Sequence, residues 1–329
     1  MALAPLAVPP ANVIKSKLDL IQNRLENVVL GSQEASSLLI ISLLAGGHAL
    51  IQGEPGIGKT SLAKAIAHLI HGRFRRVQFT PDLLPSDILG YSVYHQASGR
   101  FEFMEGPVFT HLLLADEINR TSPRVQSALL ECMNEGQVSL DGETRHLATP
   151  FMVVATQNSL YSTGTFALPE PQLDRFLISI EMHLPPPAMQ SRILQQHLQG
   201  THQVNTLEPL ATVEEVRGWQ QAARNIAVAE TICHYIVALC EAVRHHRKLR
   251  QGVSTRGSLS LLRAAQASAL LQGQPAVFPD DVKRVFIPVL AHRLALADEE
   301  QNSWSGEEPG RRRQIATSLQ SILSEVPVP

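Results

Sequence analysis

The sequence is poor in cysteine, which limits the chemistry that thiols can perform in it. Three cysteines occur among 329 residues: Cys132, Cys233 and Cys240. No two of them have the spacing of a metal-binding pair. Cys233 and Cys240 fall seven residues apart on one predicted helix, so their Cα atoms would lie about 10 Å apart, too far for a disulfide bond. We therefore interpret all three as buried helix cysteines in a reducing compartment.

The sequence also has no excess of positive charge. Lys and Arg number 28 and Asp and Glu number 30, which gives a formal net charge of -2. A protein that binds nucleic acid needs a basic excess on some face. The basic run RHHRKLR, from Arg244 to Arg250, falls on a predicted helix, and we interpret it as a solvated face or a surface for a partner protein. We expect no nucleic-acid partner.

Long hydrophobic runs are absent. The most apolar stretch, LLIISLLAGGHALI, is short and is interrupted by Gly46 and Gly47, so it predicts no membrane span. The first ten residues are apolar but lack the basic segment that begins a signal peptide. Hydrophobic residues make up 44% and charged residues 18%, which is typical of a globular chain. We expect a cytoplasmic protein with two domains.

Short apolar runs alternate with helical patterns between about residue 12 and residue 184. Because the runs lack the alternation of half-exposed strands, they predict strands buried on both faces, in a parallel sheet covered by helices. Ser122 and Pro123 predict the start of one helix, and Gly136 predicts its end. The fold class is therefore α/β. The predicted strands are 48–52, 76–79, 111–116, 151–156 and 176–182.

Two further segments of this half predict β-hairpins. Residues 92–103 turn near Ser98 and Gly99, and residues 137–147 turn at Asp141 and Gly142. Neither hairpin is needed to complete the sheet, so both are candidate functional additions.

Three consecutive prolines follow Leu184 and end the alternating pattern. We place a domain boundary there, with one domain at 1–184 and a second at 185–329. No strand pattern returns in the second domain. Its predicted helices are 188–200, 213–225, 229–248, 257–272, 279–293 and 311–324.

The segment GEPGIGKT follows a predicted strand and opens a predicted helix, which is the setting of a phosphate-binding loop. Its glycines allow backbone amides to point at phosphates, and the helix N-terminus adds partial positive charge. Lys59 would neutralise the β and γ oxygens, and Thr60 would bind Mg²⁺. The predicted nucleotide-binding residues are Gly53, Glu54, Pro55, Gly56, Ile57, Gly58, Lys59, Thr60 and Ser61.

Two carboxylates end the third predicted strand, in the segment LLLADEINR. Asp116 would lie at the carboxyl end of the sheet beside the phosphate loop, where it could serve a bound Mg²⁺. Glu117 could orient and deprotonate an attacking water. This pair favours hydrolysis over small-molecule phosphorylation, and no N-K-x-D base-reading motif of a signalling GTPase is present. The alternative is that both carboxylates cap the following turn.

Three more polar residues are candidates for the same reaction. Asn158 follows the fourth predicted strand and could hold the water or the γ-phosphate. Arg175 directly precedes the fifth strand and could act as an arginine finger towards a neighbouring subunit, the alternative being an ion pair with Asp174 or Glu170. Arg256 lies in the first turn of a predicted helix, where a cation is unfavourable unless an anion is near. We predict that Arg256 contacts the γ-phosphate when the helical domain closes.

The order of these motifs resembles that of AAA+ ATPases, and in detail that of the MoxR family. The segments RVQFTPDLLPSDILG, QSALLECMNEGQVSLDG, GTFALPEPQLDRF and GVSTRGSLSLLRAA extend the resemblance from about residue 12 to residue 293. It implies an αβα core with strand order 5-1-4-3-2, an insert hairpin in helix 2, a hairpin before the sensor 1 strand, and a helical lid. The resemblance also implies Asn158 as sensor 1, Arg175 as the arginine finger and Arg256 as sensor 2.

The segment NVVLGSQE matches the family's adenine-side region with one extra residue before Gln33. The resemblance therefore implies that the backbone around Val29 and Gly31 packs on the adenine. The segment EEPGRRRQ, near residue 310, and the first ten residues match nothing in the family pattern.

The resemblance implies a ring, usually a hexamer, that hydrolyses ATP to ADP and phosphate with Mg²⁺. Family members act as chaperones on protein clients, often with a partner that contains a von Willebrand factor A domain, and some serve metal-cofactor insertion or complex maturation. The alternatives are a scaffold that binds ATP without appreciable hydrolysis, a magnesium-chelatase-like ATPase subunit, and an AAA+ protein that acts on DNA. An intact Glu117 argues against the scaffold, and the near-neutral charge argues against DNA.

Overall fold

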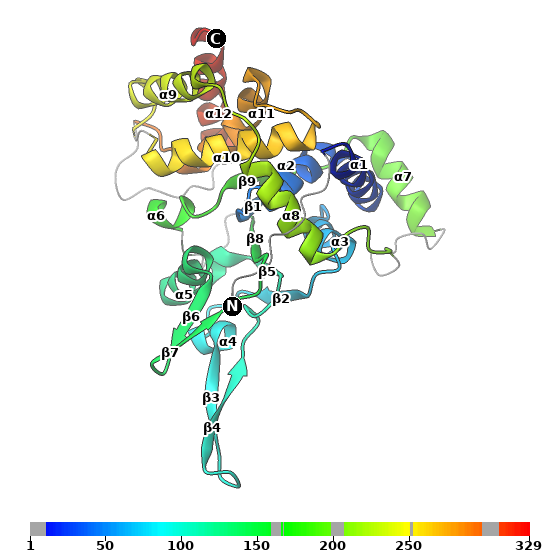
Figure 1. Cartoon of the computed structure of the whole chain (residues 1–329), viewed down its shortest axis with the longest axis vertical. Coiled ribbons are helices and arrows are strands. Elements are labelled where there is room, and N and C mark those ends of the chain that lie inside the picture. Colours follow the sequence, from blue (N-terminus) through cyan, green and yellow to red (C-terminus); the bar gives the residue numbers. More distant parts are fainter. Residues whose placement is uncertain (1–10, 159–165, 167, 199–206, 251–252, 298–308) are drawn as a thin grey trace.

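The computed structural model describes residues 11–158, 166, 168–198, 207–250, 253–297 and 309–329 (Figure 1). A parallel five-stranded sheet lies at its centre, in the order β2-β5-β8-β1-β9. If these five strands are numbered 1 to 5 along the chain, the order read from the β9 edge is the predicted 5-1-4-3-2. Each predicted strand is confirmed, with its ends shifted by a few residues at most. The strands are β1 (Ala49–Gly53), β2 (Phe74–Gln78), β5 (Leu112–Asp116), β8 (Met152–Asn158) and β9 (Ile178–Glu181).

Helices cover both faces of this sheet. Alternate side chains of each central strand therefore pack into different hydrophobic clusters. In β5, Leu112 and Leu114 pack into one cluster, and Leu113 and Ala115 pack into the other. The first cluster is covered by α1 (Ala11–Val28), α2 (Gln33–Leu44) and α3 (Lys59–Leu69), and the second by α4 (Pro85–Leu89) and α5 (Pro123–Glu135). The central strands are therefore continuous apolar runs because helices bury both of their faces.

The predicted ends of α5 are confirmed. Ser122 has the extended backbone of an N-cap residue, Pro123 is the first helical residue, and Gly136 ends the helix in the left-handed conformation with φ 62°. The Ser122 side chain makes no capping hydrogen bond, so Pro123 and Gly136 define the helix ends. Short helices at 118–120 (η1, Ile118–Arg120) and 170–173 (α6, Glu170–Leu173) complete this part.

Both predicted hairpins are present and lie side by side. β3 (Gly90–His95) and β4 (Arg100–Glu105) form one, which projects far from the sheet (Figure 1), and β6 (Gln137–Leu140) and β7 (Glu143–His146) form the other. Asp141 and Gly142 have φ 54° and 79°, as a two-residue hairpin turn requires. Ser92 Oγ donates to Asp141 Oδ2 at 2.7 Å, so the turn of the β6–β7 hairpin contacts the β3–β4 hairpin near its base.

Beyond residue 184, the described chain consists of helices and the turns and loops that connect them, with two isolated β-bridges. All six predicted helices are confirmed, but the one predicted at 229–248 ends at Arg244, so most of the basic run Arg244–Arg250 lies in a turn. Leu249 is buried and forms a bridge with Leu296, which draws the chain away from the helical path. The helices are α7 (Pro187–Leu198), α8 (Val213–Arg224), α9 (Glu230–Arg244), α10 (Thr255–Leu271), α11 (Pro279–Leu290), η3 (Ala291–Arg293) and α12 (Pro309–Glu325).

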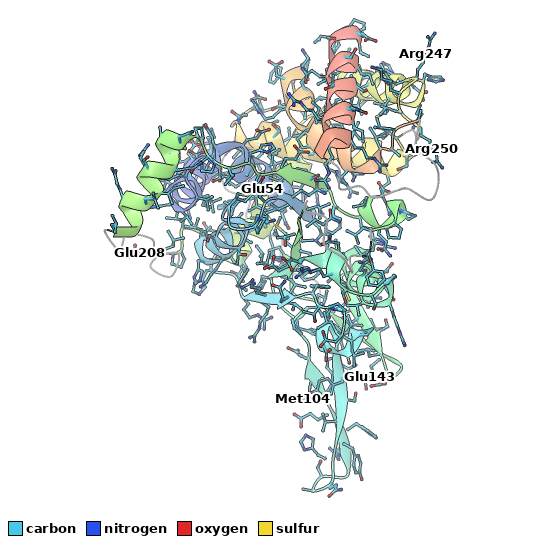
Figure 2. The ribbon with its side chains drawn as sticks, turned by 180° about the vertical axis from the view of Figure 1, so that it is seen from behind. Glu54, Met104, Glu143, Glu208, Arg247 and Arg250 are labelled. Atoms are coloured by element: carbon cyan, nitrogen blue, oxygen red, sulfur yellow. The ribbon has the colours of Figure 1, made fainter. Side chains whose placement is uncertain are left out.

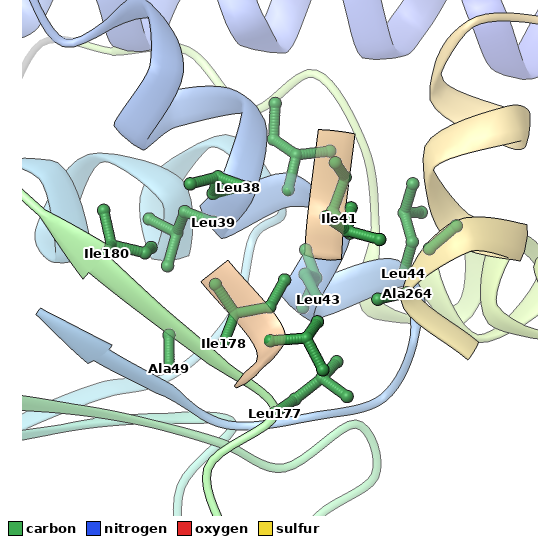
Figure 3. Packing of buried hydrophobic residues seen from close by; sticks show 14 of the residues in the cluster. Leu38, Leu39, Ile41, Leu43, Leu44, Ala49, Leu177, Ile178, Ile180 and Ala264 are labelled. Atoms are coloured by element: carbon green, nitrogen blue, oxygen red, sulfur yellow. The ribbon is translucent and has the colours of Figure 1, made fainter. Parts of the chain in front are cut away.

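The helical region and the sheet share one hydrophobic cluster. Figure 3 shows Ala264 of α10 packed near Leu44 of α2, with Leu177 and Ile178 of the β9 segment below them. The chain therefore folds with continuous packing across residue 184, and the boundary between domains 1–184 and 185–329 stays a prediction.

The expectation of three buried cysteines is wrong at one position. Cys132 and Cys240 are buried, but Cys233 is exposed. Cys240 shares the buried face of α9 with Ile236 and Leu239, and Cys233 lies on the outer face of the same helix. None of the three forms a disulfide bond, as predicted. Within the described ranges, no helix combines the length and the apolar composition that a membrane crossing requires.

Candidate nucleotide-binding site

The predicted phosphate loop connects β1 to α3. Gly58 is the N-cap of α3 and has φ 96°, a conformation that other residues adopt only with strain. Gly53 is equally constrained, because a Cβ there would lie 2.3 Å from the carbonyl oxygen of Met182. These two glycines explain how the loop can lie flat against the end of β9 and expose its amides at the start of the helix.

Lys59 is the first residue of α3 and is folded back into the loop. Its Nζ donates to the carbonyl of Gly53 at 2.8 Å, and its side chain is largely buried. Burial lowers the pKa of Lys59, and the charges of Asp116 and Glu117 oppose that shift. The ammonium group is therefore held at the point where phosphate oxygens would enter the loop.

Asp116 and Glu117 are held in place by Thr156, a residue that sequence reasoning missed. Thr156, near the end of the neighbouring strand β8, donates its hydroxyl to Asp116 Oδ1 at 2.5 Å. The same hydroxyl accepts the backbone N–H of Glu117 at 2.9 Å. Thr156 therefore fixes both predicted carboxylate positions relative to the sheet edge.

Glu117 has an unusual backbone conformation, with φ 57° and ψ 51° in the left-handed region. A residue other than glycine is strained there, by about 1–3 kcal/mol, and such strain is common at functional sites. Gln78 of β2 and Arg120 of η1 each donate to Glu117 Oε2 at 2.9 Å. The strained backbone and these two donors direct the carboxylate along the sheet edge, next to Asp116.

Arg76 of β2 is a second residue that sequence reasoning missed. Its guanidinium donates to Asp116 Oδ2 through Nη2 at 2.6 Å and through Nε at 3.1 Å. Both oxygens of Asp116 therefore already accept hydrogen bonds.

The predicted metal residues, Thr60 and Asp116, offer only oxygen ligands. No group of three or more His, Cys, Asp or Glu side chains that could hold a metal ion occurs in the described parts of the chain. Mg²⁺ does not need such a cage, since it keeps several waters and takes its other ligands from substrate phosphates. Because Asp116 already binds Thr156 and Arg76, it fits a role through a metal-bound water. The residues present fit a Mg²⁺ that enters with a nucleotide.

The structure places the backbone of Asn158 where the sequence predicts it. Asn158 is the last residue of β8 and is in register with Gly53, the last residue of β1. Its side chain lies outside the described part of the structure.

The structure places Val29 against the phosphate loop and Gly31 against the segment that leads into α7. A Cβ on Gly58 would lie 2.9 Å from Val29 Cγ1, so the Val29 side chain packs directly on the loop. A Cβ on Gly31 would lie 3.1 Å from the sulfur of Met189, on α7. This turn therefore packs between the phosphate loop and the segment that leads into α7, and its contact with the adenine stays a prediction.

The structure does not bring Arg175 and Arg256 to the phosphate loop of their own chain. Arg175 precedes β9, and Leu177 N–H donates to the carbonyl of His48, which precedes β1. Because β9 and β1 are parallel, this end of β1 is the edge of the sheet opposite to Gly53. Arg256 lies 3.8 Å from Asp174, at the same edge. The expectation that Arg256 approaches the loop of its own chain is not met in this conformation.

The partner of Arg175 also differs from the alternative predicted for it, an ion pair with Asp174 or with Glu170, whose side chain lies outside the described part of the structure. Arg175 Nη1 donates to the carbonyl of Leu130, at 2.8 Å, and makes no ion pair with Asp174. Asp174 instead binds Arg293, a buried arginine of η3, at 2.8 Å. Sequence reasoning did not identify Arg293, because nothing near it in the chain marks it as the partner of a residue 119 positions earlier.

Comparison with known proteins shows which family the chain resembles. Residues 48–178 match the ATPase family associated with various cellular activities, and residues 241–312 match the AAA lid domain. Protein MoxR of Paracoccus denitrificans is 34% identical over 93% of this chain and 94% of its own length. Chaperone MoxR1 of Mycobacterium tuberculosis is 38% identical over 83% of this chain and 76% of its own length. This chain belongs to the MoxR family of AAA+ ATPases.

Two further similarities fit this membership. The uncharacterised protein YeaC of Bacillus subtilis is 43% identical over 84% of this chain and 86% of its own length. A crystal structure of a protein from Cytophaga hutchinsonii, assigned as an ATPase, matches with a TM-score of 0.85 and 33% identity over 97% of both chains. The predicted MoxR resemblance and the predicted AAA+ core with a helical lid are confirmed. The matched lid ends at residue 312, within the first turn of α12.

Proposed function

We propose that this MoxR-family protein assembles into a ring, hydrolyses ATP to ADP and phosphate, and uses the cycle to remodel a protein client. The observation that carries the proposal is the position of Glu117. It adjoins Asp116 at the edge of the sheet that holds the phosphate loop, with its backbone bound by Thr156 and its carboxylate bound by Gln78 and Arg120. A scaffold that only binds nucleotide needs no carboxylate held in this way.

In this mechanism, the loop amides and Lys59 bind the phosphates of ATP, and the Val29–Gly31 turn contacts the adenine. Glu117 accepts a proton from the attacking water, which Asn158 helps to orient. Mg²⁺, when bound, would neutralise charge on the phosphates, with Thr60 and Asp116 as its protein partners. The other phosphate-loop residues, Gly53 to Ser61, position the substrate.

We further propose that Arg175 and Arg256 act on the nucleotide of a neighbouring subunit. Both lie at the sheet edge opposite to the loop of their own chain, so a second copy is the partner that their position allows. A cation that reaches the terminal phosphate would stabilise charge in the transition state. Loss of that phosphate would then loosen the contact between subunits.

The ring, which we propose to be a hexamer in the cytoplasm, would pass this motion to its client through the two hairpins. A partner with a von Willebrand factor A domain and a role in metal-cofactor insertion remain proposals from family resemblance. A magnesium-chelatase-like subunit and a non-hydrolysing scaffold are the competing functions.

Steady-state phosphate release tests the proposal. The wild-type protein should release phosphate from ATP, and Glu117→Gln should lower the rate by at least about 10²-fold, because the water loses its base. Glu135→Gln, an exposed carboxylate on α5, is the matched control and should leave the rate unchanged. Assembled wild-type rings that release no phosphate would favour the scaffold and overturn the proposed hydrolysis.

A further inference from the structure

A fully buried amide binds the turn that follows Glu117. Gln126 lies in the first half of α5 and has none of its surface exposed. Its Nε2 donates to the carbonyls of Ile118 and Thr121, each at 3.2 Å, and to the carbonyl of Phe166 at 3.4 Å. Ile118 is the first residue of η1 and Thr121 directly follows η1, so one amide binds both ends of this short helix.

The turn needs support of this kind, because the backbone of Glu117 is in the left-handed region. Strained backbone persists only where the surrounding structure holds it from several sides. The N–H of Glu117 donates to the hydroxyl of Thr156, and its carbonyl accepts the N–H of Arg120. Gln126 fixes the three residues that follow, so the direction in which the chain leaves Glu117 is set as well.

The amide of Gln126 is oriented for donation. Among the described residues, its buried Oε1 has no hydrogen-bond partner, whereas its Nε2 contacts three carbonyls. The reverse orientation would place the amide oxygen against those carbonyl oxygens, so the hydrogen bonds decide the assignment. A buried oxygen without a partner is destabilising. The amide is therefore explained better by what its N–H groups hold than by filling space in the core.

The helix that carries Gln126 leads to the two hairpins. α5 ends at Gly136, and the chain continues directly into β6. Figure 2 shows Glu143, on β7, beside the β3–β4 hairpin, which carries Met104. Gln126 therefore joins the turn after Glu117 to the helix that leads to the hairpins.

We propose that Gln126 is a positioning residue for ATP hydrolysis. It holds η1, and through η1 the backbone of Glu117, in the conformation that directs the carboxylate along the sheet edge. It acts through Glu117 and has no contact of its own with the nucleotide or the water. This inference rests on the proposed function, in which Glu117 accepts a proton from the attacking water.

The kinetics of Gln126→Met test the proposal, because methionine keeps the length of the side chain and removes the donors. A misplacement of about 1 Å costs about 10²-fold in rate, so a smaller one should lower kcat about 10-fold and leave KM within about 2-fold. Ser127→Ala, at the next position of α5, is the matched control, since its hydroxyl accepts from Gln172 and does not contact the turn. It should leave kcat within about 2-fold of wild type.

A double-mutant cycle separates positioning from a general structural role. In a Glu117→Gln background, Gln126→Met should leave the residual rate within about 2-fold, because the carboxylate that it positions is already absent. Single turnovers with protein in excess over ATP measure this slow rate. A further fall of about 10-fold in that background would overturn the proposal, as would an unchanged kcat in the wild-type background or a rise in KM as large as the fall in kcat.

Two further measurements cover a variant that does not fold and a protein that does not hydrolyse ATP. Gln126→Asn keeps an amide but is too short to bind both ends of η1, so it should also lower kcat, and an unchanged kcat would count against the proposal. In hydrogen–deuterium exchange, the N–H groups of Glu117 and Arg120 should exchange about 10-fold faster in either variant than in wild type. If the wild-type protein releases no phosphate, the proposed function fails. Unchanged exchange shows separately that Gln126 does not hold the turn.

Discussion

The carboxyl-terminal edge of the sheet holds a phosphate loop, Lys59 and two carboxylates, whereas the amino-terminal edge holds a group of arginines around Asp174. The first edge carries the residues that we propose to bind nucleotide and activate water, but it lacks Arg175 and Arg256. The second edge has these cations but no loop. Each edge supplies what the other lacks, which favours a head-to-tail contact between copies, and such contacts close into rings when the rotation permits.

The largest expected effect comes from separating the two edges genetically. Arg175→Ala should lower kcat for ATP hydrolysis about 10³-fold, as loss of an arginine finger does. Lys59→Ala should abolish ATP binding. Mixing the two inactive proteins one to one should restore activity, because about a quarter of the interfaces would then join an intact loop to an intact Arg175. Mixtures that stay inactive at every ratio would show that Arg175 does not act between subunits.

Arg256 can be tested in the same way. If it also acts between subunits, mixtures of Arg256→Ala with Lys59→Ala should recover activity. If Arg256 serves its own chain after a large closure, no ratio should restore it. The outcome decides whether the amino-terminal edge acts as one unit.

A smaller effect is expected within the carboxyl-terminal edge. Thr156→Val keeps the shape of the side chain but removes the hydrogen bonds to Asp116 and Glu117. We expect kcat to fall about 10²-fold, because misplacement of a catalytic group by about 1 Å has that cost, with little change in KM. Thr156→Ser retains the hydroxyl and should stay near wild type. A raised KM with an unchanged kcat would contradict a role in positioning Glu117.

At the amino-terminal edge, Asp174 should contribute to the stability of the folded protein. Asp174→Asn leaves Arg293, whose side chain is 5% exposed, without its counter-charge. Breaking a buried pair of this kind should lower the free energy of unfolding by about 3 kcal/mol, measured by urea denaturation. Asp280→Asn removes an exposed partner of Lys283 and should change it by less than about 0.5 kcal/mol. If both changes lowered the free energy of unfolding equally, the Asp174–Arg293 pair would not stabilise the fold more than an exposed ion pair does.

The smallest expected effect concerns a buried histidine that precedes β1. Burial lowers the pKa of His48 to about 4. At pH 5 the unfolded chain binds a proton at this residue and the folded chain does not. The free energy of unfolding therefore decreases as the pH is lowered from about 6.5 to about 4. Between pH 7 and pH 5 this amounts to about 2 kcal/mol.

His48→Gln should therefore lose about 2 kcal/mol less than the wild-type protein over that range, in urea denaturation at both pH values. The exposed His234→Gln should behave like wild type. Identical pH dependence in wild type and His48→Gln would show that His48 does not remain neutral in the folded protein.

Local patterns in the sequence predict most of the fold and half of the site. Buried strands, hairpin turns and the phosphate loop depend on neighbours in the chain, so their positions could be predicted to within a few residues. Thr156 and Arg76 could not, because their roles arise from pairing between β8, β5 and β2, which are distant in sequence. Register alone would have brought Thr156 beside Asp116, had the strand order been combined with the strand ends.

The remaining errors concern how helices pack. The sequence predicts that Arg256 lies in the first turn of α10, but it does not predict which edge of the sheet Arg256 approaches. The exposed Cys233 and the turn after Arg244 have the same cause, since the buried face of α9 and the burial of Leu249 depend on tertiary contacts. Packing between distant segments is therefore the information that a single sequence does not supply.

The contact between the two hairpins has a mechanical consequence. The guanidinium of Arg145, on β7, lies 4.0 Å from the ring centre of Phe103, on β4, and Ser92 is hydrogen-bonded to Asp141. The β6–β7 hairpin, including its turn, therefore contacts the β3–β4 hairpin near its base. The β3–β4 pair extends six residues on each strand, or roughly 17 Å from base to tip. A lever of that length turns a rotation of about 10° at its base into a tip displacement of about 3 Å. The exposed aromatic pair Tyr94 and Phe101, near the tip, would therefore move farther than residues at the base of the hairpin.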